Sequence, residues 1–283
     1  MKHQHNEDHH DDHGGFQRDL RATGAAINRR ALLRLAATLG GSAAALNLLG
    51  CGSAATAPTS ATDTTTGTTT GTTTGGTCSR IPSETEGPFP GDGSNGPTVL
   101  TAAGVVRSDV RSSFAGLSGM ADGVPLTIAL TIVSASTCAP LANRAVYIWH
   151  CDRLGRYSLY NAGVTNQNYL RGIQETDANG KVTFTSIYPG CYSGRWPHIH
   201  FEVYPSLAQA TSVANKIATS QIAMPKATND LVYATAGYEQ SVLNQARISL
   251  ATDGIFADGA SLELATVSGS VAGGLTATLS VAI

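Results

Sequence analysis

The segment that decides how this sequence folds reads Arg195-Trp196-Pro197-His198-Ile199-His200-Phe201-Glu202-Val203. Side chains alternate between the two faces of a β-strand, so His198, His200 and Glu202 are expected on one face. The apolar residues between them fall on the other face, as is typical of a strand that covers a core. Two residues of strand separate the imidazoles by about 7 Å at Cα, close enough for both to bind one ion. The segment therefore predicts a strand with a metal-binding face.

Outward from this strand, short strand-like segments and turns alternate along the chain. The strand candidates lie at residues 125–134, 145–150, 181–187 and 198–204, near Ile248, and between residues 262 and 283. Asp152-Arg153-Leu154-Gly155 and Asp177-Ala178-Asn179-Gly180 are typical of turns, and residues 213–220 suggest a short helix. Short strands at this spacing predict an all-β fold over residues 80–283: a β-sandwich of mainly antiparallel strands with long loops and few short helices.

The composition excludes two classes of protein. Only 13% of the 283 residues are charged, and the formal net charge is −2. A nucleic-acid-binding protein would show a basic stripe, and a coiled coil needs charged flanks. Apolar residues make up 42% of the chain, which is enough for a hydrophobic core. We therefore expect a globular domain that does not bind nucleic acid.

The first fifty residues are typical of an export signal. A leader rich in His and Asp precedes Arg29-Arg30, which is followed by an apolar run over residues 36–50. Paired arginines before such a run resemble a twin-arginine signal. The run is shorter than the roughly 20 residues that a membrane-spanning helix requires. Residues 1–50 therefore predict export to the periplasm or the cell surface.

A linker follows the signal. Leu48-Leu49-Gly50-Cys51 resembles a bacterial lipobox, which predicts a lipidated Cys51 and a membrane tether. Residues 51–79 are rich in Thr and Gly and bury too little apolar surface to fold, so both the leader and this linker are expected to be disordered. Four cysteines then remain, and in an oxidising compartment they could form two disulfides in three alternative pairings: Cys78, Cys138, Cys151 and Cys191.

The candidate metal ligands are two histidines and two tyrosines. After the leader the chain has only three histidines, His150, His198 and His200, and it has no Cys-x-x-Cys motif for zinc. Tyr157 and Tyr192 each follow a turn. A phenolate is a hard anionic ligand whose proton, with a pKa near 10, is displaced only by a strongly Lewis-acidic ion. Ferric iron meets that requirement and also binds imidazole.

Three groups of residues together resemble a known family. They read Trp149-His150-Cys151-Asp152-x-x-Gly155-Arg156-Tyr157, then Thr176-Asp177-x-x-Gly180-x-x-x-Phe184-x-x-x-x-Pro189-Gly190-x-Tyr192, then Arg195-x-x-His198-Ile199-His200-Phe201. Ser83-Glu84-Thr85-Glu86-Gly87-Pro88-Phe89-Pro90 resembles the opening of the same domain. The pattern, over roughly residues 80–260, is similar to that of the intradiol ring-cleavage dioxygenases, and most of all to protocatechuate 3,4-dioxygenase and its exported relatives.

The resemblance implies a site and a reaction. It implies a non-haem Fe(III) centre with Tyr157 and His198 as equatorial ligands and Tyr192 and His200 as axial ligands. Arg195 corresponds to the arginine beside the substrate and Gln221 to the active-site glutamine. Tyr192 would also act as a base for the substrate. The implied reaction uses O2 to cleave a catechol-type ring between its two hydroxyl-bearing carbons, and the product is a muconate-type diacid.

Alternatives to this reading come from the same motifs. Transthyretin-like binding modules share the turn patterns, so the chain could be a non-catalytic binding module on an exported lipoprotein; Arg195, His198 and His200 argue against it. A cupin also carries His-x-His on a strand but needs a third histidine downstream, and none follows His200. His150 is expected to be structural or to support the site from behind. The long helical region of the catechol 1,2-dioxygenases is absent, so their helical dimer is not expected, and the oligomeric state stays open.

Overall fold

The structure is a computed structural model that describes residues 77–283. Its eight strands form two four-stranded sheets, with strand orders β4-β1-β8-β7 and β3-β2-β5-β6. The strands are β1 (Pro125–Val133), β2 (Ala145–Trp149), β3 (Arg171–Glu175), β4 (Lys181–Ile187), β5 (His198–Tyr204), β6 (Ala218–Ala223), β7 (Thr266–Ser270) and β8 (Gly274–Ala282). Every pair of neighbours is antiparallel except β1 and β8. The predicted all-β sandwich is confirmed.

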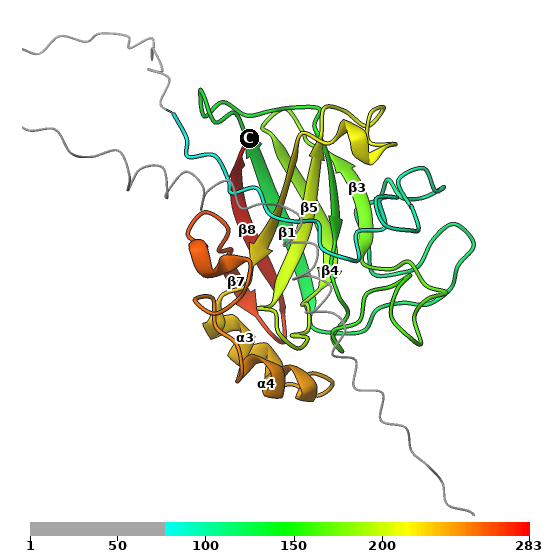
Figure 1. Cartoon of the computed structure of the whole chain (residues 1–283), viewed down its shortest axis with the longest axis vertical. Helices are drawn as coiled ribbons and strands as arrows, with labels where there is room; N and C mark the ends of the chain where they lie inside the picture. Colours follow the sequence, from blue (N-terminus) through cyan, green and yellow to red (C-terminus); the bar gives the residue numbers. More distant parts are fainter. Residues whose placement is uncertain (1–76) are drawn as a thin grey trace, which may run out of the picture. The chain divides into compact units, whose positions relative to one another are not determined.

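Helices are few and short. α3 (Lys226–Tyr233) and α4 (Glu239–Gln245) follow β6 and lie next to each other at one end of the strands (Figure 1). Two single turns of 3-10 helix occur at Val213–Asn215 and Phe256–Asp258. Within the described part of the chain, neither helix approaches the length and apolar character that a membrane-spanning segment requires.

The main core lies between the two sheets. Leu126, Ile128 and Leu130 alternate along β1 and are at most 1% exposed, and they share a core with Ile199 and Phe201 of β5. Alternation places these side chains on the inner face of each sheet because successive residues of a strand point in opposite directions. The predicted apolar face of β5 is therefore confirmed.

The opposite face of β5 is buried as well. All seven residues of β5 are buried, because the segments before β1 and between β2 and β3 cover the outer face of this sheet. Arg171 of β3 helps to hold this cover in place. It is 1% exposed and donates to the carbonyl oxygens of Phe89 and Pro90 at 2.9 and 2.7 Å. The face that carries the two histidines is thus shielded from bulk water.

Several sequence-based boundaries were wrong. Ile248 lies in a turn after α4 rather than in a strand, and residues 213–220 hold one 3-10 turn and the start of β6 rather than a helix. β3 was not predicted, because Arg171 and Gln174 interrupt any apolar alternation although Arg171 is buried. The region from 262 to 283 contains two strands, β7 and β8.

One disulfide joins Cys78 to Cys138, whose Cα atoms lie 5.3 Å apart. Cys151 and Cys191 are buried free thiols, so of the two disulfides that four cysteines allow, the described residues contain one. The predicted export signal (residues 1–50), the lipidated Cys51 and most of the linker (51–79) lie outside the described residues.

Candidate active site

Four side chains predicted to bind iron meet at one point. The Nε2 atom of His198 lies 3.1 Å from Nε2 of His200, 3.2 Å from the Tyr157 hydroxyl oxygen and 3.4 Å from the Tyr192 hydroxyl oxygen. The tyrosines come from loops that are 35 residues apart in the sequence and the histidines from β5. Two phenol oxygens and the Nε2 atom of His200 are therefore brought within contact distance of His198 Nε2.

The sheet fixes the two histidines. In the register of the sheet, His200 lies opposite Trp149 of β2 on one side and Gln221 of β6 on the other. The Trp149 indole stacks on the His200 ring with a centroid distance of 4.8 Å and an interplanar angle of 6°. His198 and His200 are 2% and 3% exposed. Their positions therefore depend on strand pairing and ring packing rather than on a mobile loop.

Turns place the two tyrosines. Asp152 closes the turn before Tyr157, because its carboxylate accepts hydrogen bonds from the backbone N–H groups of Leu154 and Arg156. Gly155 in this turn has φ +79°, and a Cβ atom there would lie 2.9 Å from Cβ of Tyr192. The turn that carries Tyr157 is thus packed directly against the residue that carries the second phenol, and Gly155 is needed for that approach.

The imidazoles are suited to binding a metal ion. Burial lowers the pKa of both His198 and His200 well below the usual value, and the Arg195 charge adds to the effect, so both rings are neutral at pH 7. Nδ1 of His198 donates a hydrogen bond to the carbonyl oxygen of Trp196, which leaves the Nε2 lone pair directed at the cluster. Both histidines thus present the protonation state that a metal ligand requires.

The spacing of the donors fits a shared ion. Ligand atoms about 2.0–2.1 Å from one metal lie about 2.8–3.4 Å from each other at coordination angles of about 90–110°, and the three separations from His198 Nε2 fall within this range. Counting only His, Cys, Asp and Glu, residues 77–283 contain no group of three or more arranged to hold a metal. Two tyrosine oxygens and two imidazole nitrogens together form a donor set that fits ferric iron.

Arg195 and Gln221, the other two residues of the predicted site, are hydrogen-bonded to each other. Both are buried, and Nη2 of Arg195 donates to Oε1 of Gln221 at 2.6 Å. Gln221 in turn donates from Nε2 to the carbonyl oxygen of Thr85 at 2.9 Å. Gln221 is cross-strand neighbour to His200, so β6 carries the glutamine into the site.

Comparisons with known proteins agree with this geometry. A family model described as Dioxygenase matches residues 95–215. The solved structure of an intradiol ring-cleavage dioxygenase from Tetranychus urticae is similar at 26% identity with a TM-score of 0.57, and the alignment covers 73% of this chain and 95% of that one. Over these residues the chain is similar in sequence and fold to the intradiol ring-cleavage dioxygenases. Catechol 1,2-dioxygenase 2 of Acinetobacter lwoffii is 44% identical over 54 residues, which are 19% of each protein, so the match spans under a fifth of that relative.

Two other polar residues, His150 and Glu202, take part in structural hydrogen bonds. His150 pairs through Nε2 with Ser186 Oγ at 2.7 Å and through Nδ1 with the Cys151 carbonyl oxygen at 2.8 Å, which supports the structural alternative. Glu202, on the same face as the two histidines, accepts from the Tyr204 hydroxyl at 2.6 Å and from Lys216 at 3.0 Å. None of these four hydrogen bonds involves one of the four converging donor atoms.

Sequence reasoning missed one acidic residue of the site. Asp253, which is 0% exposed, accepts a hydrogen bond from Nε of Arg195 at 3.0 Å. It lies 58 residues after Arg195 in a loop without a recognisable motif. No local pattern could have indicated this long-range ion pair.

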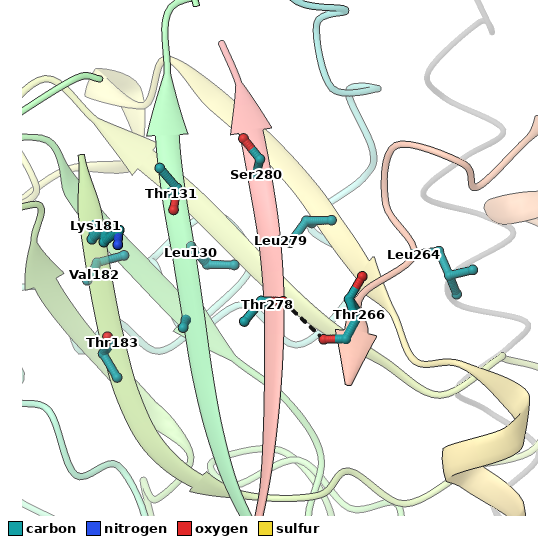
Figure 2. A pocket seen from close by; sticks show the side chains of 11 residues that line it. Leu130, Thr131, Lys181, Val182, Thr183, Leu264, Thr266, Thr278, Leu279 and Ser280 are labelled. Atoms are coloured by element: carbon teal, nitrogen blue, oxygen red, sulfur yellow. Dashed lines mark hydrogen bonds between the residues drawn. The ribbon is translucent and has the colours of Figure 1, made fainter. Parts of the chain in front are cut away.

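Two open hollows on the surface are lined by residues other than those of the predicted site. A hollow of about 420 Å³ lies on the outer face of the sheet β4-β1-β8-β7, where Thr131, Thr278 and Thr266 line it (Figure 2). Another, of about 530 Å³, is bordered by α3 and α4. None of the predicted site residues lines either hollow, and the first is surrounded mainly by threonine, serine and aliphatic side chains.

Proposed function

We propose that this chain is a non-haem Fe(III) dioxygenase that cleaves a catechol-type substrate with O2 between its hydroxyl-bearing carbons, giving a muconate-type diacid. The iron ligands would be Tyr157, Tyr192, His198 and His200. The observation that carries the proposal is that two phenol oxygens and Nε2 of His200 lie within 3.1–3.4 Å of His198 Nε2.

The ligand set supports ferric iron in particular. Two phenolates and two neutral imidazoles would leave a ferric site with one net positive charge, which favours an anionic diol. Bound iron would supply Lewis acidity and a template that holds both oxygens of the diol. Nearly complete burial of three of the ligands keeps bulk water away from that template.

The two tyrosines differ in accessibility, which supports different roles. Tyr157 is 1% exposed, and its ring packs against Phe89 at a centroid distance of 5.0 Å. Tyr192 is only half-buried. A half-buried side chain on a turn can move when a substrate binds, so we assign Tyr192 as the base that accepts a substrate proton. Tyr157 would remain a permanent ligand.

Arg195 and Gln221 act on the substrate side. The Arg195 guanidinium is buried, and Arg195 precedes His198 by three residues in the sequence. We assign to it the stabilisation of negative charge on a substrate oxygen. Gln221 restrains the guanidinium through its hydrogen bond to Nη2. A non-catalytic binding module would have no need for these two residues beside a ligand set, which disfavours the transthyretin-like alternative.

We also propose that the protein is exported and tethered through a lipidated Cys51. The disulfide between Cys78 and Cys138 supports export, because disulfides persist mainly in oxidising compartments.

The proposal is tested on purified protein by iron analysis, visible spectroscopy and oxygen uptake with a panel of catechols. We expect about one ferric ion per chain, a tyrosinate-to-iron charge-transfer colour, and oxygen consumption that depends on the catechol. Tyr192→Phe should keep the iron but slow turnover at least about tenfold, whereas Tyr233→Phe, a buried tyrosine that donates to the Pro189 carbonyl oxygen, should keep both colour and turnover. A colourless protein with stoichiometric iron would refute ligation by two tyrosines.

A further inference from the structure

We propose that Asp253 is a positioning residue that holds the Arg195 guanidinium at the angle from which it meets the substrate. The inference deepens the function proposed above and depends on it. It starts from the loop between α4 and β7, which contributes Asp253 and Phe256 to the site's surroundings. This loop lies beyond residue 215, where the match to the family model ends.

Each oxygen of the Asp253 carboxylate accepts two hydrogen bonds. Its Oδ2 atom accepts from Nε of Arg195 at 3.0 Å and from the backbone N–H of Trp196 at 2.6 Å. Its Oδ1 atom accepts from the backbone N–H groups of Ile255 and Phe256 at 2.8 and 3.1 Å. One oxygen thus fixes the segment that enters β5, and the other fixes the loop itself.

Arg195 is held at two nitrogens of its planar group. Asp253 binds Nε, and Gln221 binds Nη2 at 2.6 Å. Two hydrogen bonds to a planar guanidinium define both the direction and the rotation of its plane. Of these two partners Asp253 is the charged one, and it forms a buried ion pair with the guanidinium.

The same carboxylate also supports a histidine. Asp253 binds the N–H of Trp196, and the carbonyl oxygen of Trp196 accepts from Nδ1 of His198. The Phe256 ring, 6.4 Å from the His198 ring and 5.8 Å from the Arg195 guanidinium carbon, closes the same corner. Asp253 therefore contacts no reacting atom, but acts through two residues that do.

The charge of Asp253 is what we expect to matter. A buried guanidinium without a counter-ion is strongly unfavourable, so Asp253→Asn should let Arg195 turn away from Gln221 toward a better solvated position. An arginine that stabilises charge developing during the reaction affects kcat rather than substrate binding. A displacement of about 1 Å is enough to lower the rate by about 100-fold.

The test compares Asp253→Asn with Asp258→Asn, an exposed aspartate in the same loop. We expect Asp253→Asn to keep its iron and visible band, to lower kcat about 10–100-fold and to change KM less than about threefold, with Asp258→Asn unchanged. A crystal structure of Asp253→Asn should show Arg195 displaced from Gln221. Combining Asp253→Asn with Arg195→Gln should give turnover no lower than Arg195→Gln alone.

Other results would overturn the inference. An unchanged kcat, an unmoved Arg195, or independent rate losses that multiply in the double variant would each show that Asp253 does not act through Arg195. If Asp253→Asn does not fold, Asp253→Glu keeps the charge but moves it, and an unaltered kcat in that variant would also refute the role. If the iron-loaded wild type consumes no O2 with any catechol, the proposed function fails, and the position of Arg195 in the Asp253→Asn crystal still decides the present inference.

Discussion

The disulfide between Cys78 and Cys138 offers a prediction whose size follows from the structure. It closes a loop with a sequence separation of 60 and joins the start of the described domain to the turn after β1. A cross-link over a loop of about 60 residues lowers the chain entropy of the unfolded state enough to stabilise the fold by about 4 kcal/mol. The segment that carries Cys78 is also attached by backbone hydrogen bonds, because Ile81 donates its N–H to the Ala282 carbonyl oxygen at 2.9 Å.

Replacing both cysteines with serine should therefore lower the free energy of unfolding by about 4 kcal/mol. With a urea m-value of about 2–3 kcal/mol/M, the midpoint should fall by about 1.3–2 M. Unfolding can be followed by the fluorescence of Trp149 and Trp196, which are both buried. Because the effect acts on the unfolded state, oxygen uptake at 25 °C should be unchanged.

The control is a reductant added to each protein. Dithiothreitol should move the wild-type midpoint to that of the double variant and leave the double variant where it is. If the double variant loses less than about 1 kcal/mol in its free energy of unfolding, the reasoning is refuted. The segment between the two cysteines would then not become disordered in the unfolding transition that urea produces.

Two further predictions concern the site and its support. Gly155→Ala should slow catechol-dependent oxygen uptake at least about tenfold, since the new methyl group would lie 2.9 Å from Cβ of Tyr192. The matched control is Gly163→Ala, because Gly163 also has a positive φ but its Cβ would lie 3.7 Å from the end of the Arg156 side chain. Equal rates of oxygen uptake in the two variants would contradict the prediction. Burial lowers the pKa of His150 from 6.5 to about 4, so the folded state resists protonation and stability should fall as pH drops from 6.5 to 4, by up to about 3 kcal/mol. Urea titrations of wild type and His150→Gln at pH 7 and pH 4.5 measure this, and parallel losses in both proteins would exclude His150 as the cause.

The parts of the fold that could be predicted from sequence are those with a local signal. The bounds of β4 and β5 were predicted correctly, because alternation and flanking turns define them within a few residues. The same alternation placed His198 and His200 on one face. The pairing of the four cysteines was not predictable, since it depends on which chain segments meet in space.

Burial of both faces of the sheet β3-β2-β5-β6 explains why the sequence did not predict β3. Arg171 lies on β3 and is buried because five backbone or hydroxyl oxygens accept its hydrogen bonds, so a charged residue occupies a place where the sequence pattern expects an apolar one. Tyr147 of β2 likewise uses its hydroxyl to bind the Pro90 carbonyl oxygen at 2.7 Å. Polar residues that attach a cover to a sheet look like surface residues in sequence.

This arrangement explains how one site can combine rigid and movable donors. The histidines belong to β5, which is paired on both sides by β2 and β6 and buried throughout. The tyrosines belong to turns, and of these Tyr157 lies beneath Phe89 whereas Tyr192 is half-buried. A donor that must leave to admit substrate can only be one whose backbone and ring are not fixed by the sheet or its cover. Of the four converging side chains, Tyr192 meets that condition best, which is why its replacement is the sharpest test of the reaction proposed for this chain.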